Sequence, residues 1–323
     1  MLRRRFLQLA STAGAATLFA PSIVRAEAAW PEKPVKFIVP FGAGGGTDAI
    51  ARFWADQLSQ AFGQQFVVDN RGGASGMIGT EAVAKSAPDG YTFLVCSNTT
   101  PVNLPLLRKV PYDPKTMQAV VRLGDSVTGV SAHPSTGFKT LKDLIDNAKA
   151  NPGKLAGATP GLGTNAHLRM EMMSYRTGTK YLHVPYRGGA DAVNDLVAGT
   201  VQFMNDPSCN PHAKAGKLTM LCTSHSVRNP DFPDVPTMTE LGYTGMDVPL
   251  WFAVWGPTGI PQPVLDKLHA KVSEISKTPE MTKKLQVVSA APVVSTQAEL
   301  ISFRDAETQA MAELIKTANI KLE

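Results

Sequence analysis

The stretch "VPFGAGGGTDAIARFWADQL", residues 39–58, decides the fold. The apolar run at 35–39 has the length and composition of a buried strand, and it leads into a turn with four glycines. An amphipathic helix pattern follows at 47–62. Exposed N–H groups at a helix N-terminus, together with the helix dipole, favour an anion. The stretch therefore predicts an anion-binding loop, and the alternative is a tight turn with only a structural role.

Two nucleotide-binding motifs do not fit this loop. A dinucleotide fold requires G-x-G-x-x-G after the strand, and Thr47 occupies the position of the last glycine. Asp69 ends the next strand pattern, where a ribose-binding acid would lie, so a dinucleotide site remains an alternative. A P-loop requires a lysine, which residues 42–47 lack.

Strand and helix patterns alternate through the rest of the chain. Such alternation predicts parallel sheets with helices on both faces, and 323 residues suggest about two domains. We expect the second unit to be inserted in the first, with crossings near 123–130 and 248–254. The expected strands are 35–39, 65–69, 91–97, 127–133, 155–159, 180–186, 201–206, 217–223 and 251–257, and the expected helices are 47–62, 77–86, 141–150, 164–178, 189–199, 211–216, 261–277 and 296–318.

The first 28 residues have the pattern of an export signal. Three arginines precede a short apolar stretch and small residues, and Arg3–Leu7 fits the twin-arginine motif, with a plain secretory signal as the alternative. We expect cleavage after Ala26 or Ala28 and a periplasmic location, where free dinucleotide is scarce. Removing residues 1–28 leaves 28 of the 32 basic and 26 of the 27 acidic residues, a net charge of +2.

Several classes of function find no support in the mature chain. No basic cluster with interleaved aromatic residues indicates nucleic acid, and no later apolar run is long enough to cross a bilayer. The six histidines are scattered, and no nucleophile is grouped with a base, so we expect no metal, cofactor or catalytic site. Cys96, Cys209 and Cys222 are an odd set; Cys209 and Cys222 either pair or are small buried residues.

Further loops have the same pattern, in which small residues precede an expected helix. Each follows an expected strand, and the carboxyl ends of strands are where open α/β sheets bind ligands. His167 follows one of these loops, and we interpret it as structural. Asp206 either receives a ligand group or caps the next helix. The candidate residues in these loops are Ala74, Ser75, Gly76, Thr99, Thr100, Gly163, Thr164, Asn165, Asn205 and Asp206.

Several segments in order resemble the Bug receptors, the periplasmic solute receptors of the tripartite tricarboxylate transporter family. They are "WPEKPVKFIVPFGAGGGTDAIAR" (30–52), "VVDNRGGASGMIGTEAVAKSAPDGYTFL" (67–94), "VPYDP" (110–114), "HVPYRGGADAVNDLVAGTVQFM" (183–204), "AGKLTMLCTS" (215–224), "PDVPTMTELGY" (233–243) and "WGPTGIPQPVLDKL" (255–268). The resemblance covers nearly the whole mature chain.

The resemblance implies an α/β, two-domain periplasmic-binding-protein fold of the venus-flytrap type II, each domain being a sheet flanked by helices. Domain 1 would comprise 29–126 plus 252–323, and domain 2 would comprise 127–251. A ligand carboxylate would be held by the first two loops, with the opposite domain contributing its own loops. The implied contacts are Phe41, Gly42, Ala43, Ala74, Ser75 and Gly76 on one side and Gly163, Thr164, Asn165, Asn205 and Asp206 on the other. Met77 stands where the family often has an asparagine, which removes a polar group from that lining.

The expected function is therefore that of a binding protein and not of an enzyme. It would capture a small organic carboxylate as a monomer and deliver it to an integral-membrane permease. A sensor that reports to a membrane kinase and an exported enzyme are the alternatives. The sequence leaves the acid open among aliphatic dicarboxylates, tricarboxylates, amino acids and aromatic acids, with a mono- or dicarboxylate favoured.

Overall fold

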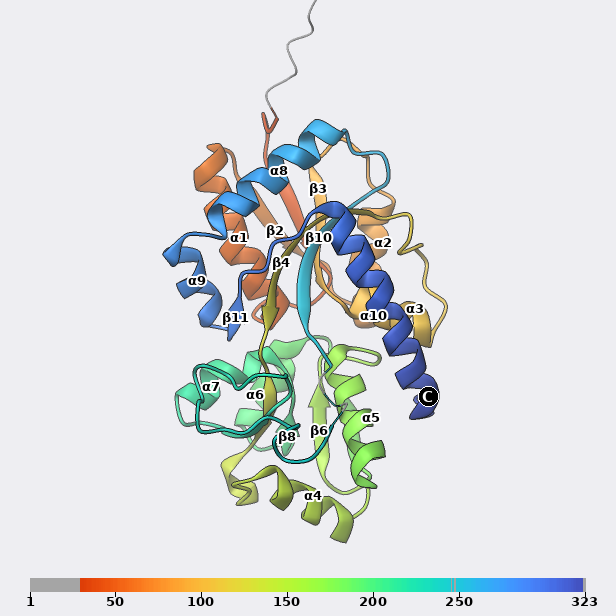
Figure 1. Ribbon diagram of the computed structural model, residues 1–323, viewed down its shortest axis with the longest axis vertical. Helices are drawn as coiled ribbons and strands as arrows, with labels where there is room; N and C mark the ends of the chain where they lie inside the picture. The colour runs from red at the N-terminus through yellow and green to blue at the C-terminus, as the bar shows by residue number, and fades with distance from the viewer. Residues whose placement is uncertain (1–29, 245, 247, 322–323) are drawn as a thin grey trace, which may run out of the picture.

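The computed structural model describes residues 30–244, 246 and 248–321. Two sheets form two lobes stacked along the long axis of the molecule (Figure 1). The chain leaves the first sheet after Ser126 and enters the second at Gly129. It returns between Thr223 and Trp251, so the second sheet is built from a segment inserted in the first.

The first sheet has the strand order β11-β4-β10-β3-β1-β2. The strand β1 pairs in parallel with β2 and β3, as the alternation predicts. The strand β10 runs antiparallel to β3 and β4, so the sheet is mixed and not fully parallel. Its strands are β1 (Val35–Val39), β2 (Phe66–Asn70), β3 (Thr92–Ser97), β4 (Gln118–Ser126), β10 (Trp251–Gly256) and β11 (Ala290–Ala291).

Helices cover both faces of this sheet because its strands are apolar on both sides. Phe37 packs with α1 and α8, while the next residue, Ile38, packs with α2 and α10. Trp54 of α1 is fully buried in the first of these clusters. The helices are α1 (Gly46–Phe62), α2 (Met77–Ala84), α3 (Leu104–Leu107), α8 (Gln262–Ile275), α9 (Pro279–Gln286) and α10 (Gln297–Thr317), with a short turn η1 (Ala74–Gly76) and the turn η2 (Thr99–Asn103).

The second sheet has the order β7-β6-β8-β5-β9 and is also mixed. The strand β6 is parallel to β7 and β8, and β5 is antiparallel to β8 and β9. Residues of α4 and α5 cover one face, and residues of α6 cover the other. The elements are β5 (Gly129–Ala132), α4 (Leu141–Ala150), β6 (Ala156–Thr159), α5 (Asn165–Thr177), β7 (Leu182–Pro185), α6 (Gly189–Val197), β8 (Phe203–Met204), α7 (Asn210–Lys214) and β9 (Thr219–Thr223), with the short turns η3 (Pro134–Thr136) and η4 (Pro207–Cys209).

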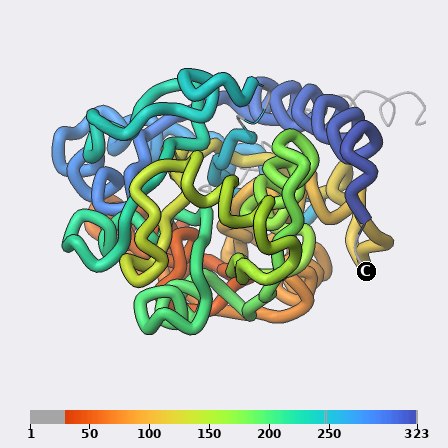
Figure 2. The backbone as a smooth tube through the Cα atoms, turned by 90° about the horizontal axis from the view of Figure 1, so that it is seen from below, coloured from red at the N-terminus to blue at the C-terminus, as the bar shows by residue number. Residues whose placement is uncertain are grey.

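The C-terminal helix α10 belongs to the first lobe but reaches the second. It packs on β4 and η2, and its C-terminal half lies beside α5, which forms one wall of a groove with it. The view from below shows α10 in blue running along the side of the molecule, next to the green α5 (Figure 2). One long helix therefore touches both lobes.

The strand and helix patterns identified most elements, with boundaries that differ by at most two residues. Four strands and helices were missed: β4, which carries Arg122 in its centre, the short β11, the short α3, and α9. Trp251 already pairs with Asp125 in the first sheet, one residue before the boundary expected for that unit. Among the described residues, no helix has the length and apolar character needed to cross a membrane. The export signal expected at 1–28 lies outside the described residues.

All three cysteines are buried free thiols, so Cys209 and Cys222 do not pair. Burial raises the pKa of Cys96 and of Cys222 to about 12 and that of Cys209 well above its usual value. We predict that a thiol reagent labels none of the three in the native protein at pH 8 and labels all three after unfolding. A reductant should leave the unfolding temperature unchanged. Rapid labelling of the native protein, or a reductant-sensitive unfolding temperature, would contradict this arrangement.

Candidate functional site

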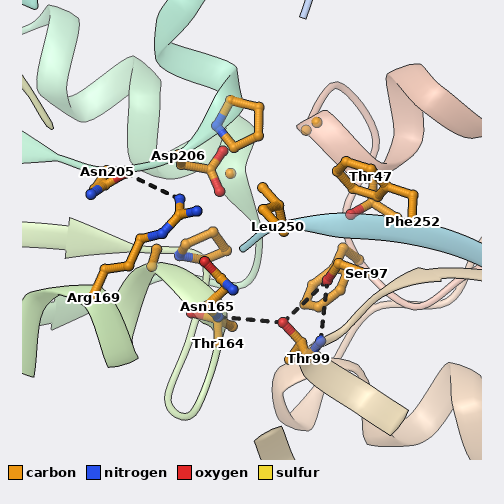
Figure 3. Close-up of a pocket in the computed structure, with 17 residues that line it drawn as sticks. Thr47, Ser97, Thr99, Thr164, Asn165, Arg169, Asn205, Asp206, Leu250 and Phe252 are labelled. Atoms are coloured by element: carbon orange, nitrogen blue, oxygen red, sulfur yellow. Dashed lines mark hydrogen bonds between the residues drawn. The ribbon is translucent and has the colours of Figure 1, made fainter. Parts of the chain in front are cut away.

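A cavity of about 40 Å³ lies between the two sheets. Thr47, Phe252, Ser97 and Thr99 face it from the first lobe, and Arg169, Asn205 and Asp206 face it from the second (Figure 3). Leu250, from the segment that returns to the first sheet, lies between the two groups. The remaining lining residues are Phe41, Gly45, Gly46, Pro160, Thr164, Asn165, Ala166, Gly189 and Pro207.

The first glycine loop is held in place by a buried acid. Asp48 accepts hydrogen bonds from the Gly44 N–H at 2.8 Å, from Arg52 at 2.9 Å and from Asn70 at 2.8 Å. Asn70 also donates to the carbonyl of Phe41 at 3.1 Å. Burial alone would raise the pKa of Asp48, but these hydrogen bonds and the Arg52 charge together lower it. The ionised acid thus fixes the loop that begins α1.

Three helices begin at the cavity. Gly45 and Gly188 are the N-cap residues just before α1 and α6, and no side chain caps either helix. Thr164 is the N-cap residue of α5, and its hydroxyl accepts a hydrogen bond from the His167 N–H. The first N–H groups of a helix have no partner within the helix, and they carry its positive dipole end. The lining by Gly46, Thr47, Ala166 and Gly189 therefore suits an anion.

Arg169 brings a buried positive charge to the far side of the cavity. Its Nε donates to the Val248 carbonyl at 3.0 Å, and its Nη1 donates to Thr128 at 2.5 Å and to Asn205 at 3.3 Å. Asn205 accepts from Thr128 as well and donates to Ser224 at 2.7 Å. The Asn205 amide therefore lines the cavity chiefly as a brace for the guanidinium.

Asp206 caps a turn and also lines the cavity, and its role as a ligand contact stays a prediction. Its Oδ1 accepts hydrogen bonds from the N–H and the hydroxyl of Ser208, at 3.0 and 2.7 Å, and so caps the turn that follows. The same side chain lines the cavity. Burial raises the pKa of Asp206, and the bonds from Ser208 and the charge of Arg169 oppose that rise.

The two lobes are tied together beside the cavity by Asn165. Its N–H donates to the Thr99 hydroxyl at 3.4 Å, and its side-chain Nδ2 donates to the Pro249 carbonyl at 2.7 Å and to Asn98 at 3.3 Å. Figure 3 shows Asn165 between Arg169 and Thr99, with Ser97 next in line. Thr99 and Asn165 thus line the cavity and also join its two walls.

Six of the thirteen candidate residues line the cavity, and seven do not. Ser75 lies at the contact between lobes, because a Cβ on Gly161 would meet its Oγ at 2.9 Å. The Gly163 N–H donates a hydrogen bond to His167 Nδ1 at 3.1 Å, and the Thr100 carbonyl accepts one from the Tyr112 hydroxyl. The lining residues are Phe41, Thr99, Thr164, Asn165, Asn205 and Asp206, and those outside the lining are Gly42, Ala43, Ala74, Ser75, Gly76, Thr100 and Gly163.

Several lining residues escaped the sequence analysis. Arg169 stands four residues after Asn165, hence on the same face of α5, and that spacing was the available signal. Gly189 was placed at the start of the helix expected at 189–199 and was named as no site residue. Phe252 was assigned to the returning strand at 251–257 and Leu250 to the crossing before it, and neither carries a polar group that points to a site.

Glycines from the two lobes meet at the mouth of the cavity. A Cβ added to Gly188 would lie 3.2 Å from the Gly42 nitrogen, and one on Gly44 would lie 3.3 Å from the Ala190 side chain. A Cβ on Gly46 would lie 3.1 Å from Pro207. These distances describe a closed cleft, in which small residues let the two backbones touch.

His167 takes part in a structural cluster, as expected. Its ring stacks on that of His183 with centroids 4.1 Å apart, and its Nε2 lies 3.6 Å from Glu171. Burial and the neighbouring His167 lower the pKa of His183 to about 4. Within the described part of the chain, no three His, Cys, Asp or Glu side chains are grouped so that they could hold a metal ion.

Comparison with known proteins identifies the class. Residues 50–320 match the model of the tripartite tricarboxylate transporter family receptor. Protein BugT of Bordetella pertussis is 37% identical over 301 residues, covering 91% of this chain and 92% of its own. The chain therefore belongs to this family of receptors, as its segments indicated.

Solved structures confirm the fold. The periplasmic binding protein BugD superposes with a TM-score of 0.87 at 33% identity, over 91% of this chain and all of its own. R. palustris Rpa4515, solved with adipate, gives the same TM-score and identity over 90% of this chain and 99% of its own. The protein thus has the two-lobed periplasmic-binding-protein fold, and related receptors bind carboxylates.

We predict that Gly188→Val weakens ligand binding without unfolding the protein. The φ of Gly188 is 177°, an extended value open to any residue, and the three atoms nearest to an added Cβ all belong to Gly42 across the cleft. Affinity for the acid selected by the screen described below should fall at least about tenfold, and the ligand-free unfolding temperature should change by less than about 2 °C. The affinity of Gly188→Ala should lie between that of the unchanged protein and that of Gly188→Val. Undiminished affinity in Gly188→Val would show that this contact is not needed for closure.

Proposed function

We propose that the protein is an exported receptor that captures a small organic carboxylate in this cleft and delivers it to an integral-membrane permease of the tripartite type. The observation that carries the proposal is the meeting of three helix N-termini at a closed cavity between two lobes. Membership of the receptor family and the adipate held by Rpa4515 support it.

Capture requires the two lobes to move relative to each other. The proposed units are 29–126 plus 252–323 and 127–251, with the crossings near 127 and 250 as the hinge. In the open form the helix N-termini would face water. In the closed form they would be shielded from water, and electrostatic attraction for an anion is stronger in such surroundings. A ligand that bridges both lobes would therefore favour closure.

The signal expected at 1–28, with cleavage after Ala26 or Ala28, supports delivery to the periplasm. We propose that the mature chain acts as a monomer and only holds its ligand. Its cavity offers an anion site, a cation and several hydroxyls, a set that suits binding and orientation. The same site would serve a sensor for a membrane kinase, so the permease assignment rests on the family.

A screen of carboxylic acids tests the proposal. The exported protein should unfold at a higher temperature with one class of acid, in a panel of aliphatic mono- and dicarboxylates, tricarboxylates, amino acids and aromatic acids. A ligand with a micromolar dissociation constant, at about a thousandfold excess, adds about 4 kcal/mol to the unfolding free energy. NAD serves as the control. No shift with any acid, in protein freed of carried-over ligand, would refute the receptor function.

Asp206→Ala separates the ligand contact from the cap. If Asp206 contacts the ligand, affinity should fall about tenfold, because a buried acceptor for a ligand N–H or O–H is lost. Loss of the cap alone lowers the unfolding free energy by about 0.5–2 kcal/mol. Thr140→Ala is the matched control, since Thr140 caps α4 outside the cavity. Unchanged affinity in Asp206→Ala, with stability lowered as in Thr140→Ala, would remove Asp206 from the site.

A further inference from the structure

A buried acid on the C-terminal helix lies directly behind the hinge. Glu307 of α10 is only 8% exposed. Its Oε1 accepts a hydrogen bond from Asn98 Nδ2 at 2.6 Å, and its Oε2 accepts one from the indole N–H of Trp251. Trp251 begins β10, and Asn98 follows β3. The carboxylate thus joins three elements at the point where the chain returns to the first sheet.

The same Asn98 connects this acid to the cavity. Its Nδ2 also donates to the Pro249 carbonyl at 3.0 Å, and its Oδ1 accepts from Asn165 Nδ2 at 3.3 Å. Asn165 Nδ2 donates in turn to the same Pro249 carbonyl at 2.7 Å. Each amide nitrogen therefore faces acceptors only, which fixes the direction of both amides. A continuous chain of hydrogen bonds runs from Glu307 to a residue of the cavity wall in the other lobe.

We propose that Glu307 is a positioning residue for the ligand-binding site, and that uptake of one proton by its carboxylate reverses this chain of amides and weakens the closed form. The inference rests on the proposed function only where it concerns ligand affinity. The reversal itself is a property of the protein without ligand.

Donors and acceptors explain the reversal. A proton on Glu307 Oε1 would point at the Asn98 amide nitrogen, which is itself a donor, and Trp251 offers only a donor at Oε2. Turning the Asn98 amide places its oxygen against the new O–H. Its nitrogen then faces the nitrogen of Asn165, which must turn as well and gives up the Pro249 carbonyl. Asn165 Oδ1, buried and without a hydrogen-bond partner among the described residues, would be replaced at its position by an NH₂ group.

The surroundings place this change in the physiological range. Burial raises the pKa of Glu307 to about 7, against the opposing effects of Asn98, Trp251 and the Arg122 charge. From β4, Arg122 faces the acid together with Asp125, and these two are paired at 2.6 Å. Burial raises the pKa of Asp125, and the charge of His225, from the second lobe, opposes that rise. On α10 itself, the neighbouring Arg304 is bound to Asp305 and the Pro114 carbonyl.

A purely structural role for Glu307 makes a different prediction. Removing the buried acid would then destabilise the packing of α10 on β10, and the signal of the Asn165 side-chain amide would not change with pH. The two roles are separated by following the Asn165 side chain, which has no direct contact with Glu307 in the chain of bonds above. This measurement is made on the ligand-free protein and does not depend on ligand binding.

The test is a pH titration of the ligand-free exported protein, labelled with ¹⁵N at tryptophan and asparagine, from pH 5.5 to 8.5. The Trp251 indole and the Asn165 side-chain amide, assigned with Trp251→Phe and Asn165→Ser, should shift with one common midpoint near 7. Both titrations should be absent in Glu307→Gln. Glu313→Gln is the matched control, because Glu313 is an exposed glutamate on the same helix.

Affinity for the acid found in the screen should fall up to about tenfold from pH 8 to pH 6, with the same midpoint. In Glu307→Gln, which resembles the protonated form, affinity should be low at both pH values. A titrating Trp251 with an unmoved Asn165, or no titration of either, would overturn the proposal. Affinity that stays flat while both signals titrate would overturn the coupling to the ligand. Failure of every acid to bind would refute the receptor function, while the amide titration would still decide the reversal.

Discussion

The interaction on which the site depends is the exposure of three helix N-termini to a cavity between the two lobes. Backbone N–H groups must find partners when they are buried, and each one left without a partner costs about 1–3 kcal/mol. In this protein α1, α5 and α6 all begin at the space between the lobes, and Arg169 adds a full charge there. In the proposed function, an anion that enters as the lobes close would lie against these N–H groups and the Arg169 charge together. Closure and ligand capture would then be one event.

Local sequence predicted what local geometry governs. The stretch at 39–58 joins a strand, a glycine turn and a helix within twenty residues, and the structure has all three as expected. The strand β4 was missed because "QAVVRLGDS" carries Arg122 and Asp125 in place of a clean alternation. The antiparallel direction of β10 could not be predicted from the sequence, for another reason. Alternating strands and helices imply parallel pairing only for successive strands, whereas β10 pairs with β3 after 153 intervening residues, 98–250.

The sequence predicted candidate residues in the loops of the site but missed the buried Arg169. Turn chemistry indicated Thr164, Asn165 and Asp206, since each stands where a helix or turn begins. Arg169 was missed because a charged residue inside a helix is usually solvated, and only the fold shows that its side chain lies in the cavity. The Ala74–Gly76 turn was expected to bind the ligand. The turn lies outside the cavity lining, and its positive φ angles accompany a close approach to the other lobe, where Ser75 lies near Gly161.

The hinge explains why a helix so late in the chain bears on the site. Two segments of the chain cross between the lobes, and Asn98 and Pro249 lie beside one of these crossings. Asn165 reaches these two residues from the second lobe, so its hydrogen bonds help to hold the lobes together. Glu307 lies on the far side of the same two residues, 209 positions after Asn98. An acid with a pKa near neutrality in this position lets the proton concentration act on closure from outside the cavity. By linkage, a ligand that stabilises the closed form must in turn lower the pKa of that acid.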